Sequence, residues 1–412
     1  MNYIQVIKGN PRILLFGFLM TFFSSFGQTY VHAQFVPSIM KAFDLSNTAF
    51  GSIYAIGTVC GGFTLVYVGK KIDTVPLNKF TFTTVVGLIL SLLVLSLAPG
   101  AWMLCIGFFI NRLCGQGLFT HISLTTIAKS FTKLRGKALS VAVMGHAAGQ
   151  AIFPITISLL IAYVGWQHTL WIEATIITLV LIPTLFYIFK KGFKIVEKKG
   201  AAAVQADTAP KPKSTWSRKE ILKDPRTYLI LPGAFSIHFL ITGYHFYQVE
   251  MALSKGWAGN WIAACFIVHA IARAVSSIYT GVLIDKYSAV KLMPYFLTPF
   301  MIGLLLFMWF NNKFIAIPYL IGIAATAGMM ASLNAAVLAE MFGVENLGGI
   351  KSMYSTLTVI SSATAPLCMG FFLDKGYGFD FIIIGSVAFM LLGSFLNFFL
   401  YPKRAEEIPQ AL

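Results

Sequence analysis

The sequence predicts an all-α integral membrane protein with twelve transmembrane helices in two pseudo-symmetric six-helix bundles. The composition is 57% hydrophobic and 11% charged, whereas a soluble domain averages about 25% charged residues. Apolar runs long enough to cross roughly 30 Å of hydrocarbon recur along all 412 residues. A short motif also stands at equivalent places in the two halves of the chain. Together these features leave no room for a sizeable soluble domain.

Six apolar runs in each half of the chain predict the helices. The expected spans are 12–40, 48–69, 78–99, 101–127, 135–163, 167–190, then 227–253, 258–284, 290–311, 313–341, 348–372 and 379–401. Between the two sets lies a stretch rich in Lys, Ala and Pro, a composition typical of a flexible linker. The predicted domains are an N-terminal six-helix bundle at 1–190, a basic cytoplasmic linker at 191–226 and a C-terminal six-helix bundle at 227–412.

The formal net charge of +16 does not indicate a nucleic-acid partner, because the distribution of charge follows topology. With both termini in the cytoplasm, only Lys41, Lys255, Lys313 and Lys375 fall outside, and Arg112 and Arg273 fall within helices. The remaining Lys and Arg face the cytoplasm, which is the positive-inside bias. We therefore expect a multi-pass protein of the plasma membrane, such as a bacterial inner membrane.

The repeated motif relates the two halves. Tyr67–Asp73 closes the second predicted helix and Tyr279–Asp285 closes the eighth, and both read Tyr-x-Gly-x-x-Ile-Asp. Parallel repeats of this kind are typical of carriers whose site lies between the halves near the membrane midplane.

The whole chain resembles the major facilitator superfamily. That family has a Gly-x-x-x-Asp-Arg/Lys-x-Gly-Arg/Lys loop after the second helix; Gly69–Asp73 matches its start, while Thr74 and Pro76 depart from it. The second copy, Gly281–Asp285 followed by Lys286, is closer. The resemblance implies a major facilitator fold and a cytoplasmic gate. Its expected residues are Gly69, Asp73, Gly281, Asp285 and Lys286, with Arg135 as a candidate partner.

The start of the predicted fifth helix resembles one branch of this family. Arg135–Ser140 reads Arg-Gly-Lys-Ala-Leu-Ser, similar to the Arg-Gly-x-Ala that begins this helix in monocarboxylate transporters and oxalate:formate antiporters. The predicted eleventh helix has a similar pattern between Gly349 and Pro366.

Polar residues in apolar surroundings predict a central cavity. Residues at i and i+4 share a helix face, and four such pairs occur: Gln28/His32, Arg112/Gln116, His146/Gln150 and His269/Arg273. The first helix adds Tyr30, and the seventh adds His238, Tyr244, His245, Gln248 and Glu250. Since burying such groups against lipid is costly, we expect them to line a substrate site.

Two arginines decide the expected charge of the substrate. Arg112 and Arg273 stand in the middle of predicted spans, and Glu250 is the best acidic candidate nearby. Arg binds carboxylate and phosphate through bidentate hydrogen bonds. Monocarboxylate transporters carry Asp-x-x-x-Arg in the eighth helix, and the resemblance implies that Arg273 binds substrate, with His269 in place of that Asp.

We therefore expect a secondary transporter, not an enzyme, that moves a small organic anion by alternating access. His32 stands near the proton-linked Lys of those carriers, so proton coupling is left open. The alternative is a carrier of a metal ion or metal chelate, in which His32, His245 and His269 would be the ligands. We expect no cofactor, a monomer, and the lipid bilayer and a small anion as partners. Cationic drug export and a sensor role are less favoured, because acidic cavity residues and a signalling domain are missing from the sequence.

Overall fold

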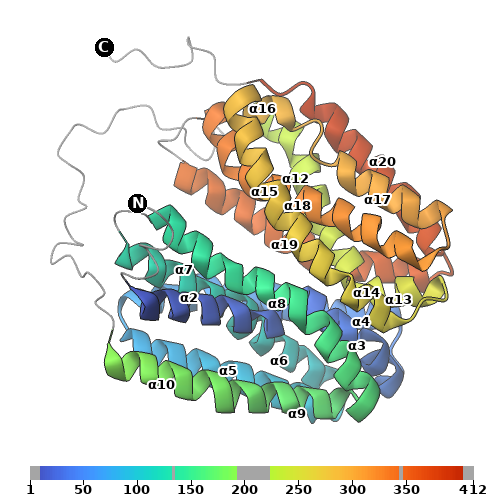
Figure 1. Cartoon of the computed structure of the whole chain (residues 1–412). Coiled ribbons are helices and arrows are strands. Elements are labelled where there is room, and N and C mark those ends of the chain that lie inside the picture. Colours follow the sequence, from blue (N-terminus) through green and yellow to red (C-terminus); the bar gives the residue numbers. More distant parts are fainter. Residues whose placement is uncertain (1–9, 132–134, 193–222, 343–346, 402–412) are drawn as a thin grey trace, which may run out of the picture. The chain divides into compact units, whose positions relative to one another are not determined.

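The computed structural model describes residues 10–131, 135–192, 223–342 and 347–401, and these residues form helices without a β-strand (Figure 1). Most of the predicted linker, residues 193–222, lies outside the described residues. The chain divides into two compact units. The first unit comprises Met1–Ala202 and His245–Phe266; the second comprises Ala203–Tyr244 and Ile267–Leu412. The segment His245–Phe266 therefore packs with the first unit, although the predicted boundary assigns it to the second bundle.

Helices α2 to α10 form most of the first unit. In chain order its α-helices are α2 (Pro11–Phe23), α3 (Thr29–Phe43), α4 (Asn47–Val68), α5 (Leu77–Ser96), α6 (Ala101–Asn111), α7 (Phe119–Ser130), α8 (Arg135–Val164), α9 (Trp166–Ile176) and α10 (Ile182–Lys191), with α13 (Gln248–Ser254) and α14 (Gly259–Ala264) from the later segment. The 3-10 turns η1 (Ser24–Gly27) and η2 (Gly69–Asp73) and the π-helical turns η3 (Arg112–Leu118) and η4 (Ile177–Leu181) connect them.

The second unit is also built of helices in the described residues. Its helices are α12 (Pro225–Phe246), which ends in the first unit, α15 (Phe266–Tyr287), α16 (Ala289–Leu292), α17 (Thr298–Trp309), α18 (Ala316–Phe342), α19 (Leu347–Asp374) and α20 (Phe379–Asn397). Within this unit α18 packs against α16, α17 and α19.

Eleven helices in the described residues are long and apolar enough to cross a membrane. The predicted ninth span, 290–311, is the exception: it consists of the short α16, a turn and the apolar α17. With that interrupted span the helices match the predicted twelve. The prediction of an all-α membrane protein is confirmed.

Chain direction changes where the local sequence permits it. Ser46 accepts a hydrogen bond from the backbone N–H of Ala49 at 3.2 Å and so caps α4, the usual role of Ser at a helix start. Gly165 joins α8 to α9 with φ of 81°, a backbone conformation that glycine adopts without steric cost.

Glycines let α2 and α8 pack closely. A Cβ added to Gly145 would collide with the Phe18 carbonyl oxygen and the Thr21 hydroxyl, and one added to Gly149 would collide with the Ser25 hydroxyl. Small residues at helix crossings are typical of membrane bundles, because they let backbones approach and gain van der Waals contact. Thus α8 packs against the part of the first span, α2 and η1, where that span is broken.

We expect Gly145→Ala to lower the thermal unfolding midpoint of the purified protein, because the new methyl group must push α2 away from α8. Overpacking a tight interior costs about 1–3 kcal/mol. Gly136→Ala is the control on the same helix, since a Cβ there meets nothing within 4 Å. A Gly145→Ala protein as stable as the Gly136→Ala protein would contradict the packing described.

Candidate functional site

The first membrane span is broken where its polar residues lie. Helix α2 ends at Phe23, η1 follows, and Gln28 has an extended backbone with φ −94° and ψ 150° before α3 begins. In a continuous helix the Val31 N–H would bond the carbonyl of Gly27. Here that N–H bonds Gln28 at 3.1 Å, so the Gly27 carbonyl is available to a partner outside its own helix.

Arg112 supplies that partner. Its Nη1 donates a hydrogen bond to the Gly27 carbonyl at 2.9 Å and another to the Thr29 hydroxyl at 3.4 Å. The guanidinium carbon lies 5.2 Å from the centre of the Tyr54 ring, a cation–π distance. The Tyr54 hydroxyl donates to the Thr29 hydroxyl at 2.9 Å. We call Gly27, Thr29, His32, Tyr54 and Arg112 the Arg112 cluster.

Two glycines and a π-helical turn bring Arg112 to the break. A Cβ on Gly27 would lie 2.7 Å from the Gly115 backbone, and a Cβ on Gly115 would lie 2.8 Å from the Gly27 Cα. Arg112 opens the π-helical turn η3, which crosses η1 at this point. Single π-helical turns are frequent at functional sites. The interruption in the fourth span therefore faces the interruption in the first.

The Arg112 cluster holds buried polar atoms without protein partners. Arg112 is 4% exposed and His32 is 5% exposed. Among the described residues, the Nε of Arg112 and both ring nitrogens of His32 lack a hydrogen-bond partner, and no carboxylate lies within ion-pairing distance of Arg112. Rings of Tyr54 and Phe108 flank His32 at 5.8 and 5.4 Å. Unsatisfied buried groups are rare in proteins, and their concentration here marks a candidate ligand site.

Two of the four predicted i, i+4 pairs do not lie on a regular α-helix, because their backbone is π-helical or extended. Gln28 lies in the break, and Gln116 lies in the wide turns of η3, so the 3.6-residue period that predicts shared faces fails for Gln28/His32 and Arg112/Gln116. Both glutamines are half-buried. His146 and Gln150 stand in regular α8, with His146 half-buried and Gln150 buried.

Tyr30 is the centre of a second polar group in the first unit. Its hydroxyl donates to the Ser25 hydroxyl at 2.9 Å, and its ring lies 5.8 Å from the His146 ring. Its carbonyl accepts from the side-chain amide of Gln248 at 3.4 Å. His245 is also buried in this unit, with its ring 5.4 Å from that of Phe266.

Other predicted residues of the seventh span take different positions. Glu250 is half-buried in α13, and its Oε2 has no partner among the described residues. Tyr244 belongs to the second unit, where its hydroxyl donates to the Ser386 hydroxyl of α20 at 2.9 Å. That bond is internal to the second unit and uses the hydroxyl in helix packing.

In the second unit, His269 and Arg273 lie on regular α15. His269 is fully buried and Arg273 is half-buried. His238 on α12 is close enough to Arg273 for an electrostatic interaction. Gly328 of α18 brings that helix against the Arg273 backbone, since an added Cβ would collide with the Arg273 carbonyl. The second unit thus has its own half-buried cation, Arg273, with the imidazole of His238 beside it.

The predicted gate residues differ between the two copies of the motif. In the first, Asp73 pairs with Lys129 of α7 at 2.5 Å. The predicted partner was Arg135; in this structure the Arg135 Nε donates to the Phe131 carbonyl at 3.2 Å instead. The Gly69 carbonyl contacts a ring nitrogen of His121 at 3.1 Å.

In the second copy, Gly281 and Asp285 belong to continuous α15, and Asp285 and Lys286 are exposed. Glu340 of α18 instead holds the following turn. Its carboxylate accepts from the Ser288 hydroxyl at 2.8 Å and from the backbone N–H groups of Ala289 and Val290 at 2.8 and 3.0 Å. The two copies therefore share a sequence pattern but connect to neighbouring helices through different residues.

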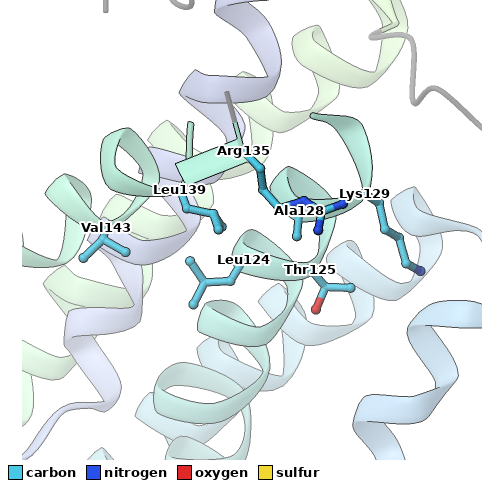
Figure 2. A pocket seen from close by; sticks show the side chains of 7 residues that line it. All are labelled: Leu124, Thr125, Ala128, Lys129, Arg135, Leu139 and Val143. Atoms are coloured by element: carbon cyan, nitrogen blue, oxygen red, sulfur yellow. The ribbon is translucent and has the colours of Figure 1, made fainter. Parts of the chain in front are cut away.

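A groove of about 610 Å³ lies beside the Asp73–Lys129 ion pair (Figure 2). Its lining residues come from the end of α7 and the start of α8: Leu124, Thr125, Ala128, Lys129, Arg135, Leu139 and Val143. None of the predicted substrate residues lines it. It is separate from the Arg112 cluster.

A buried ion pair in the second unit was missed by the sequence analysis. Arg226 is 1% exposed, and its guanidinium bonds the Asp224 carboxylate at 2.7 to 3.1 Å. The rings of Phe342 and Tyr401 lie 5.4 and 5.1 Å from it. The signal was present as Asp-Pro-Arg at a helix start, where Asp caps and Pro takes the first turn. Arg226 thus links the start of α12 to the end of α18 and to Tyr401, which follows α20.

The helical fold and its match to a family of transporters define a class: a multi-pass membrane transporter rather than an enzyme. The family model of the Major Facilitator Superfamily matches residues 17–323 and 250–411. The chain belongs to the Major Facilitator Superfamily. No match was found among curated protein sequences.

Solved structures share the fold over nearly the whole chain. A bacterial homologue of the human lysosomal transporter Spinster, in an inward-facing and occupied conformation, has a TM-score of 0.72 at 13% identity, covering 94% of this chain and 95% of its own. A D-xylose–proton symporter has a TM-score of 0.72 at 16% identity, with coverages of 95% and 98%. The nucleoside transporter NupG has a TM-score of 0.72 at 10% identity, with coverages of 94% and 99%. Identities this low establish the fold alone.

The two ion pairs should differ sharply in their contribution to stability. We expect Asp224→Asn to destabilise the protein by about 3–5 kcal/mol, because it leaves the buried Arg226 charge uncompensated. The side chains of Lys129 and Asp73 are 47% and 64% exposed, so Asp73→Asn should cost about 0–1 kcal/mol. Denaturant unfolding of both variants in detergent measures the difference. Equal effects would contradict it.

Proposed function

We propose that this protein is a secondary transporter that moves a small organic anion, a carboxylate, across the membrane by alternating access. One observation carries the proposal: Arg112 is buried in a membrane-spanning bundle, and its partners among the described residues are a backbone carbonyl, a hydroxyl and an aromatic ring. A charge in the membrane interior costs roughly 2.5–3.5 kcal/mol on insertion scales. A substrate carboxylate would compensate it better than these neutral groups.

The break in the first span suits this role. Discontinuous helices in transporters expose backbone groups to substrates and ions near the midplane. In our proposal a carboxylate binds the guanidinium of Arg112, which gives up its bond to Thr29 and keeps or exchanges its bond to Gly27. His32 adds hydrogen-bonding capacity through its two unpartnered ring nitrogens. In the second unit, we take Arg273, with His238 beside it, as a further cation for the substrate carboxylate.

Proton coupling is a finer part of the same proposal. The Asp expected beside the eighth-helix Arg is His269 here, and the first helix carries His32. Imidazole is the side chain whose ordinary titration range spans neutral pH. We propose that coupling, where present, uses these imidazoles in place of the Lys and Asp of monocarboxylate carriers.

A metal chelate is the competing substrate. Among the residues that the structure describes, no three His, Cys, Asp or Glu side chains gather closely enough to hold a metal ion. Three ligands are the usual minimum contributed by a protein site for zinc. The alternative therefore reduces to a chelate whose own carboxylates would meet the arginines, and a transport assay with metal-free and metal-loaded chelators distinguishes it.

The direct test is uptake into proteoliposomes by Arg112→Gln. Loss of the cation that meets the carboxylate should lower transport of a carboxylate substrate at least tenfold, since a charged hydrogen bond contributes about 1.5–3 kcal/mol. Arg12→Gln is the matched control, because Arg12 is exposed and, among the described residues, donates to the carbonyls of Lys191 and Gly192. Transport by folded Arg112→Gln equal to that of Arg12→Gln would refute the proposal.

Arg273 should be required as well, independently of Arg112. We expect Arg273→Gln to lose carboxylate uptake while it keeps the wild-type elution volume and unfolding midpoint, and Arg273→Lys to retain part of the activity, because the positive charge remains without the bidentate geometry. Initial rates over a range of substrate concentrations measure the effect. Unchanged uptake kinetics in Arg273→Gln would exclude a role for it in substrate binding.

A further inference from the structure

The groove in Figure 2 is apolar along its floor and cationic at one edge. Leu124, Ala128, Leu139 and Val143 supply apolar side chains from α7 and α8, and Val143 is 48% exposed. Both helices belong to predicted membrane spans, Ala101–Ser130 and Arg135–Val164. At the depth of these spans, lipid acyl chains are the most abundant apolar chains in a membrane.

The edge of the groove carries one uncompensated cation. Lys129 is held by Asp73 at 2.5 Å, and Figure 2 shows its side chain pointing away from the groove. Arg135 instead extends toward Ala128 across the groove (Figure 2). Its Nε bonds the Phe131 carbonyl, and no described carboxylate lies within ion-pairing distance of its guanidinium. Its terminal nitrogens retain the geometry that binds a phosphate in bidentate fashion.

We propose that this groove binds an anionic phospholipid of the surrounding membrane, with an acyl chain along Leu139 and Val143 and the phosphate at the Arg135 guanidinium. A phospholipid matches both chemical features of the groove. Its acyl chain fits the apolar floor, and its anionic phosphate fits the Arg135 guanidinium at the edge. The bound lipid would lie next to the Asp73–Lys129 ion pair, because Lys129 also lines the groove. Bound lipid thereby adds to the contacts that hold α7 against α8.

The test is native mass spectrometry of the purified full chain with equimolar phosphatidylglycerol and phosphatidylcholine of identical acyl chains. The wild type should retain phosphatidylglycerol preferentially. Arg135→Gln should weaken that binding about fivefold, the effect of one basic residue at an anionic lipid surface, and Arg135→Lys should keep most of it. Arg12→Gln, an exposed arginine outside the groove, should have no effect.

A second pair of variants tests the acyl-chain position. Val143→Trp fills the groove and should reduce retention of phosphatidylglycerol, whereas Met144→Trp adds the same bulk at a 62% exposed neighbour outside the lining and should not. Equal retention of the two lipids by the wild type would overturn the proposal. So would phosphatidylglycerol binding that is unchanged in both Arg135→Gln and Val143→Trp.

Discussion

The hydrogen bond from Arg112 to the Gly27 carbonyl is the interaction on which the first unit depends. A guanidinium inside a membrane bundle needs acceptors, and an intact helix offers none because its carbonyls bond within the helix. The break at Ser24–Gln28 releases the Gly27 carbonyl, and the glycine pair Gly27/Gly115 lets the two interrupted spans approach closely enough to use it. The buried charge of Arg112 therefore relies on the break in the first span for an acceptor, and on Gly27 and Gly115 for the close approach of the two spans.

Much of this was predictable from the sequence, because burial of polar groups in lipid is expensive at every position. The all-α membrane fold follows from hydropathy, and the family follows from the repeated Tyr-x-Gly-x-x-Ile-Asp motif with its loop. Arg112 and Arg273 stand out in the sequence as charges within apolar spans. The break did not follow, because Ser24–Gly27 is compatible with a helix in a membrane span and the Gly115 backbone that packs against it lies far away in the chain. For the same reason Thr29 and Tyr54, neither of which looks unusual in sequence, were missed as partners of Arg112.

The two copies of the Tyr-x-Gly-x-x-Ile-Asp motif show how far sequence symmetry extends into structure. Asp73 meets a lysine on α7, whereas Asp285 is exposed and Glu340 of α18 caps the next turn through backbone N–H groups. Both arrangements fasten a loop to a neighbouring helix end, and they differ in salt sensitivity, since exposed ion pairs are screened and helix caps are less so. A motif search cannot distinguish them, because the partner residues lie far away in the chain.

Equilibrium binding to purified protein tests the central claim most directly, because it separates recognition of charge from transport. Isothermal titration with a panel of small carboxylates, each paired with its neutral primary amide, isolates the anionic group. Our account predicts that a carboxylate binds to the wild type, that its amide binds at least tenfold more weakly, and that Arg112→Gln removes this preference. Equal binding of a carboxylate and its amide, or a preference that survives in Arg112→Gln, would contradict it.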